Sequence, residues 1–262
     1  MRHYNKIIFY FIIINSICGQ TFIDSDPNQL FIIERDQFEK KIPIQSNIFR
    51  PVFFLSDSTS FKLKVRSESY FNDNAPNQEN MDIRYFTKGY SNFNSLEFSF
   101  NSPYFSFLIE PYIQKNKFYN VNTIQRSGTF SVLNDKALED NLLKPNKPFR
   151  NFLFFIHYKG IGIGWHEGNR WWGPGFHSSL QMTNNTKPIP AQVIGTVQEI
   201  KVKNFGINAF YTFSKLNNEE GYLSKYLTSI NSSITWYGPL ILSAGISRNY
   251  LSGGLFGEYL WT

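Results

Sequence analysis

The chain has 262 residues and a formal net charge of +6; 18% of its residues are charged and 18% are aromatic. Its only cysteine, Cys18, lies near the start, so a chain that loses this leader has no disulfide, thiolate metal site or cysteine nucleophile. The positive excess is small, and no basic patch with interleaved aromatic residues accompanies it. The sequence therefore lacks the usual signature of a nucleic-acid-binding protein.

Residues 1–19 have the pattern of a secretory signal peptide. Arg2 and Lys6 make the start basic, residues 7–14 are apolar, and small residues ending at Gly19 form the exit. We therefore predict export from the cytoplasm, which also argues against nucleic acid as a partner.

Residues 20–50 are predicted to form a short N-terminal periplasmic segment. Pro27 stands near a possible helix start, and the apolar residues after it fit one helical face loosely. Residues 42–51 end in Pro51, and residues before proline favour extended backbone. We expect them to lead into the first strand.

Residues 51–262 contain repeated short segments in which apolar and polar residues alternate. Such alternation predicts strands with one apolar face. The pattern gives about ten strand candidates at spacings near ten residues, the cadence of an up-and-down antiparallel barrel. The clearest segments are residues 61–66, a hairpin over 95–110, a strand from 152, two strands or one bulged strand over 198–213, and a hairpin over 228–247.

We predict an all-β fold, an antiparallel transmembrane β-barrel of the outer membrane built from residues 51–262. Phe and Tyr are abundant, at 27 and 15, and Asn, Ser and Gly fill much of the rest, as expected for strands with one lipid-facing and one wet face. The chain stops at residues 260–262 in what reads as mid-strand, so we expect a barrel incomplete at its C-terminus. A short helix over 135–143 is expected in one connection. A secreted soluble β-sandwich would show similar alternation and remains an alternative.

The stretch from 152 to 190 carries the densest group of unusual residues. Gly160, Gly162 and Gly164 are expected to share one strand face. Three of the five Trp follow, together with an Arg, a His and a Glu. The candidate site residues are Trp165, His166, Glu167, Arg170, Trp171, Trp172, Gly173, Pro174 and Gly175.

Residues 170–175, followed by Ser179-Leu180 and residues 184–190, resemble the Wzi family of outer-membrane capsule-assembly proteins. Residues 130–135 and the glycine-alternating strand are also similar to that family. The resemblance implies an outer-membrane barrel that holds capsular or other surface polysaccharide at the cell exterior without catalysis. It also implies outer-membrane lipid and the barrel-assembly machinery as partners. Family members are longer and have a larger helical portion, so the resemblance covers a shortened or partial member.

The candidate residues suit this role chemically. Trp rings stack on the apolar faces of sugars, and Arg can bind a uronate carboxylate through two hydrogen bonds, so the polysaccharide could be acidic. A structural alternative is that the Trp side chains form an interfacial belt while Arg170 binds loop carbonyls inside the lumen.

No enzymatic activity and no cofactor or metal are expected. His166-Glu167 lacks the second His of the helical zinc motif, and a G-x-S-x-G nucleophile elbow is absent from the sequence. The alternative functions are an outer-membrane channel or transporter with a basic lumen, and a secreted soluble β-protein that binds or degrades carbohydrate. The residues expected to line such a lumen are Lys62, Lys64, Arg66, Lys201 and Lys203.

Overall fold

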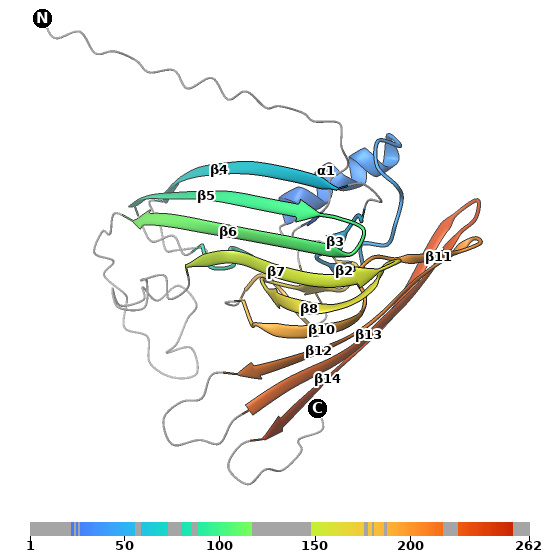
Figure 1. Ribbon diagram of the computed structural model, residues 1–262. Coiled ribbons are helices and arrows are strands. Elements are labelled where there is room, and N and C mark those ends of the chain that lie inside the picture. Colours follow the sequence, from blue (N-terminus) through green and yellow to red (C-terminus); the bar gives the residue numbers. More distant parts are fainter. Residues whose placement is uncertain are drawn as a thin grey trace, which may run out of the picture.

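The computed structural model of the protein is an antiparallel β-sheet protein with one short helix (Figure 1). The expected signal peptide, the helix over 135–143 and the end of the chain lie outside the described residues. The structure describes residues 22–23, 25, 27–55, 59–72, 80–84, 89–116, 148–175, 178–179, 181–185, 188–216 and 225–253.

Ten strands form the main sheet, and every neighbouring pair is antiparallel. Short β11 (Ile200–Val202) pairs only with β12. The order across the sheet is β4 (Ser60–Asn72), β5 (Gly89–Asn101), β6 (Phe105–Asn116), β7 (Phe149–Tyr158), β8 (Ile161–Glu167), β10 (Ala191–Thr196), β12 (Phe205–Leu216), β13 (Lys225–Tyr237) and β14 (Ile241–Gly253).

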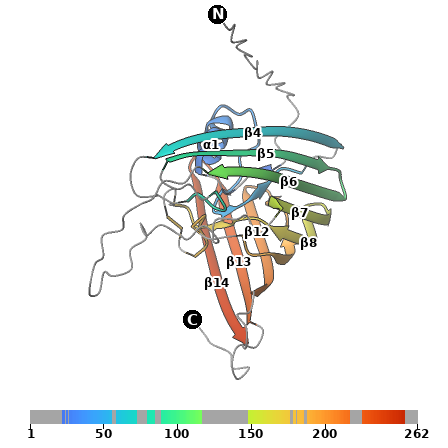
Figure 2. The same cartoon turned by 90° about the vertical axis from the view of Figure 1, so that its left-hand side faces the viewer.

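The sheet curves into a trough whose two edges are β4 and β14 (Figures 1 and 2). The expectation of an antiparallel all-β fold with a short N-terminal helix is confirmed. Among the described residues no pairing joins β4 to β14, so the sheet is open between these two edges and does not form a closed barrel there. No helix in the described part of the chain is long and apolar enough to cross a membrane.

The two faces of the sheet have opposite character because side chains alternate along each strand. Outward-facing side chains are mostly large and apolar, and many are exposed: Ile156, Ile163 and Ile194 are each more than half exposed. Inward-facing side chains are mostly small or polar, and most are buried, as for Ser99 and Asn231. The sheet therefore has its polar face inside and its apolar face outside.

The connections differ at the two ends of the sheet. At one end the strands are joined by short turns at residues 102–104, 159–160 and 238–240. The connection from β10 to β12 at the same end contains the short strand β11. At the other end the connections are longer, at residues 73–88, 117–148, 168–190 and 217–224.

The alternation correctly predicted most of these turns. Lys203-Asn204 forms the tight turn between β11 and β12 that the parity change indicated. The glycine prediction was wrong in one respect, because Gly160 does not share a face with Gly162 and Gly164. It lies in the β7–β8 turn with φ of +82°, a conformation that glycine adopts readily.

The N-terminal segment lies against the concave face. Helix α1 (Pro27–Phe38) begins with proline, which is favoured at the first helical position. The chain then runs along the trough through β2 (Phe49–Arg50) and β3 (Val52–Phe53), and β3 pairs with β1 (Phe22–Ile23). Phe53 packs on Phe155 of β7, with ring centroids 5.4 Å apart, inside a small apolar core. The wall itself begins only at Ser60.

Candidate functional site

Three segments lie on the concave face, and we call their described residues the inner segments: these fall within residues 22–55, 80–84 and 168–190. The third contains most of the predicted site. β9 (Trp171–Trp172) pairs with β2, which places Trp171 opposite Arg50 and Trp172 opposite Phe49. The sequence motif is therefore a docking point for the N-terminal segment.

The structure does not bring all the predicted site residues together. Trp165 and Glu167 lie on the outer face of β8, and Trp165 is 38% exposed. His166 is on the inner face and is buried. Because neighbouring residues of a strand point to opposite faces, His166 and Glu167 cannot act on one substrate.

Trp171 and Trp172 are 0% and 2% exposed, so neither ring is free to stack on a sugar in this conformation. The Arg50 guanidinium lies 4.9 Å from the centroid of the Trp171 ring, a cation–π distance. Arg50 Nη2 and Trp171 Nε1 both donate to the carbonyl oxygen of Gly175, at 2.9 and 2.8 Å. Trp172 makes an edge contact with Phe210 of β12 at 6.1 Å. These contacts join the motif, the N-terminal segment and the wall.

Arg170 holds the start and end of its own connection together. Its Nη2 donates to the carbonyl oxygens of His166 and Ile189, at 3.3 and 2.8 Å. Burial lowers the pKa of Arg170 to about 10, so the guanidinium is still protonated at neutral pH. Arg170 therefore contacts loop carbonyls, the geometry that the structural alternative described.

The Gly-Pro-Gly part of the motif lets the backbone leave β9 sharply. Gly173 has φ of +147° and donates its N–H to the carbonyl oxygen of Ile48 at 2.9 Å. Pro174 is exposed, and Gly175 supplies the carbonyl shared by Arg50 and Trp171.

A cavity of about 60 Å³ lies between the N-terminal segment and the wall. Ligand pockets for drug-sized molecules usually measure ~300–1,000 Å³, so this cavity is too small for a sugar chain. Its charged and titratable lining residues are Arg50, Arg170, His166 and Glu199. The Glu199 carboxylate accepts hydrogen bonds from the Ser46 backbone and the Tyr237 hydroxyl.

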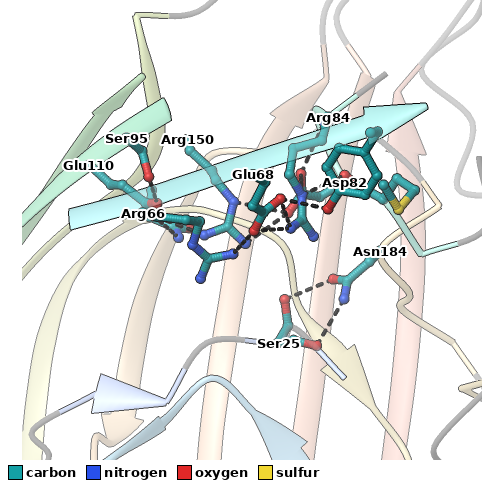
Figure 3. Close-up of polar contacts among 12 residues, drawn as sticks. Ser25, Arg66, Glu68, Asp82, Arg84, Ser95, Glu110, Arg150 and Asn184 are labelled. Atoms are coloured by element: carbon teal, nitrogen blue, oxygen red, sulfur yellow. Dashed lines mark hydrogen bonds and ion pairs between the residues drawn. The ribbon is translucent and has the colours of Figure 1, made fainter. Parts of the chain in front are cut away.

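A buried ionic network, which sequence reasoning missed, fastens residues 80–84 to the wall (Figure 3). Arg150 binds Asp82 Oδ2 through Nε and Nη2, at 3.0 and 2.8 Å, and Glu110 Oε2 through Nη1, at 2.9 Å. Arg84 binds Glu68 of β4 at 3.0 Å. Glu68 and Glu110 could have been assigned to the wet face from strand parity, but nothing in the sequence shows that Asp82 and Arg84 fold inward.

The inner segments also bind one another. Asn184 exchanges two hydrogen bonds with Ser25, at 2.7 and 2.8 Å (Figure 3). The backbone carbonyl oxygen of Asn184 also accepts from the Asp82 N–H at 2.8 Å. Residues 22–55, 80–84 and 168–190 thus form one hydrogen-bonded body inside the trough.

The lysines expected to line a lumen do not share one surface. Lys62 and Lys64 belong to edge strand β4, whereas Lys201 and Lys203 belong to β11 and its turn, on the far side of the sheet. Lys201 Nζ donates to the carbonyl oxygen of Ile44 at 2.7 Å and lies over the Tyr237 ring. It holds the N-terminal segment.

The fold and site define an antiparallel β-sheet protein with an apolar outer face and a filled concave face. Across the described part of the chain, no group of three or more His, Cys, Asp or Glu side chains is arranged to hold a metal ion. Comparison with known proteins finds no matching family model, no similar curated protein and no similar solved structure.

Proposed function

We propose that the sheet is part of the wall of an outer-membrane β-barrel with a filled lumen. The protein acts without catalysis, in assembling or attaching polysaccharide at the cell exterior. The observation that carries the membrane part is the inverted polarity of the sheet. In the described residues no second sheet covers the apolar outer face.

The amount of apolar surface on the outer face favours lipid over water. Hydrophobic burial contributes roughly 25 cal/mol per Å² of apolar surface, so leaving such a face in water is costly. Monomeric soluble proteins rarely expose contiguous apolar patches beyond a few hundred Å². The exposed outward-facing apolar residues include Phe61, Leu63, Val65, Phe154, Ile156, Ile161, Ile163, Ile194, Ile207, Ile230, Ile234 and Ile246.

The two ends of the sheet suggest an orientation. Outer-membrane barrels have short periplasmic turns and longer extracellular loops. The end with turns at 102–104, 159–160 and 238–240 would therefore face the periplasm. Helix α1 lies near this end, because Gln37 contacts residues 43–45 and Ile44 contacts Lys201 of β11 (Figure 1).

Strand direction limits how such a wall can close. Nine strands lie on the path from β4 to β14, and each pairing reverses direction, so these two edges run the same way. Joining them directly would create a parallel pair. An all-antiparallel wall, with the even strand number of bacterial barrels, needs an odd number of further strands between them.

The inner segments favour attachment over conduction. The N-terminal segment contacts β7 through Phe53 and β12 through Phe49, so it crosses the trough between them. An open water-filled channel would require this body to leave. The dispersed lysines give no continuous basic path through the described structure.

The polysaccharide role rests on the resemblance of residues 170–175 to the Wzi family. We propose that Arg170, Trp171 and Trp172 brace the N-terminal segment against the wall and do not contact sugar themselves. Trp165 would lie at the lipid boundary, where amphipathic Trp rings are favoured. Sugar would bind to the long connections at the opposite end from the turns.

Membrane fractionation tests the location, and gene deletion tests the role. We expect the protein to stay in the outer-membrane pellet after an alkaline carbonate wash and to leave it only with detergent. Release by carbonate alone would contradict a barrel. Deletion should move surface polysaccharide from cells to medium, measured as uronic acid or total sugar. Restored expression should reverse the loss.

A matched pair of variants tests the motif. Arg170→Ala should reduce both the yield of folded protein and cell-bound polysaccharide, while Gln192→Ala, on the outer face of β10, should change neither. If Arg170→Ala leaves folding and polysaccharide unchanged, the brace has no role. A normal polysaccharide level in the deletion strain would refute the function itself.

A further inference from the structure

We propose that the cavity between the N-terminal segment and the wall binds one small monovalent anion, of halide or carboxylate size, between Arg50 and Arg170. This site is independent of the polysaccharide role.

The first observation is that both arginines are buried without an anionic partner. Arg50 is 1% exposed and Arg170 is 6% exposed. Among the described residues, no carboxylate lies within ion-pair distance of either guanidinium. Burying a charge without a counterion costs free energy of folding. A fold that buries two such charges at one cavity therefore needs a compensating interaction there.

The second observation is unused hydrogen-bonding capacity. Nε and Nη1 of Arg50 and Nε of Arg170 are buried and have no hydrogen-bond partner in the described structure. A guanidinium presents five N–H donors, and those of Arg50 and Arg170 that are in use bind only carbonyl oxygens. An anion in the cavity would supply hydrogen-bond acceptors for these unpaired N–H groups.

The third observation is the size and lining of the cavity. About 60 Å³ is room for a few water-sized groups, which fits a halide or a carboxylate head. The apolar lining, which includes Phe49, Val193 and Phe210, excludes much competing solvent and strengthens an ionic contact. Glu199 does not take the counterion role, since its carboxylate is engaged by Ser46 and Tyr237.

Electrostatics agree with this geometry. Burial lowers the pKa of Arg50 to about 10, and the only carboxylate that raises it is Glu34. Burial alone lowers the pKa of Arg170, with no opposing carboxylate. At neutral pH both groups are charged, and a bound anion would restore their balance.

Anion titration of the purified full chain in detergent micelles tests the site. The protein is first exchanged into the sodium salt of a bulky sulfonate buffer, and sodium chloride or sodium acetate is then added at constant ionic strength. We expect Tm to rise with the logarithm of the anion concentration above Kd, by about 5–10 °C at 100 times Kd. Comparing the two salts distinguishes a halide site from a carboxylate site. No rise in Tm with either salt means that water fills the cavity, and overturns the proposal.

Variants locate the effect. Asn208→Asp puts a carboxylate at the cavity wall, so it should raise Tm in the sulfonate buffer and abolish the response to added anion. Asn231→Asp makes the same change on neighbouring β13 at a side chain that does not line the cavity, and should keep the response to added anion. Arg170→Met should lose the response; if it responds as the native protein does, the ion is adventitious and bound elsewhere. In crystals soaked in bromide, anomalous density beside Arg170 Nε is expected.

Discussion

Removing Arg150 should weaken the attachment of residues 80–84 to the wall. Arg150 is 3% exposed and makes two hydrogen bonds to Asp82 and one to Glu110. In Arg150→Met, Asp82 still forms its ion pair with Arg84, at 3.2 Å. Glu110 loses its ion pair and retains hydrogen bonds from the neutral side chains of Ser95 and Asn151. Breaking a buried ion pair by removing one partner costs about 3–5 kcal/mol. Because Asp82 still pairs with Arg84 in the variant, we expect a loss at the lower end of this range, about 3 kcal/mol.

Urea unfolding of the protein in detergent micelles measures this loss, with tryptophan fluorescence as the signal. Arg35→Met is the matched control, because Arg35 is exposed and pairs only with Asp36 beside it. An exposed pair of this kind contributes ~0–1 kcal/mol. In the double variant Arg150→Met with Glu110→Gln, the unpaired carboxylate is gone, and the total loss should be less than the sum of the single losses. If Arg150→Met and Arg35→Met unfold within 1 kcal/mol of each other, the network does not hold the inner segments.

Three further perturbations probe the wall and the motif. Val65→Arg, midway along the outer face of β4, should destabilise the protein folded in lipid vesicles by about 2–4 kcal/mol, whereas Phe71→Arg, one residue before the end of the same strand, should cost less; equal effects would contradict a lipid-facing surface. Gly164→Ala should lower Tm, since a Cβ there would overlap the Phe154 carbonyl and the Phe155 ring, while Gly245→Ala, with Ile48 at 3.2 Å, should be tolerated; equal melting would refute this packing. Trp171→Phe removes the hydrogen bond to Gly175 and leaves space beside Arg50, so it should cost more than about 1 kcal/mol in urea unfolding; no loss would count against the brace.

Strand positions were predictable because parity is a local property of the chain. Phe205, Ile207 and Tyr211 had to share one face of any strand, and they do. The turns at residues 102–104 and 238–240 were likewise predictable, because they contain Ser, Pro and Gly. Local pattern could not show which face is covered, because that depends on segments far away in the sequence.

The site was less predictable for the same reason. The motif at residues 170–175 was found from its composition, but its main partner, Arg50, is 120 residues upstream in an unremarkable stretch. The link between Ser25 and Asn184 spans 159 residues, and neither residue forms part of a recognisable motif. Pairings of this length follow from the complete fold and not from any window of sequence.

The position of residues 22–55 inside the trough determines the order in which the molecule must be built. This segment is made first, yet Phe49 packs against Phe210, which belongs to one of the last strands to be synthesised. The early part of the chain therefore cannot complete its packing until these late strands have been made. In the closed barrel proposed above there would be no sideways entry, so the segment would have to be in place before the last strands pair.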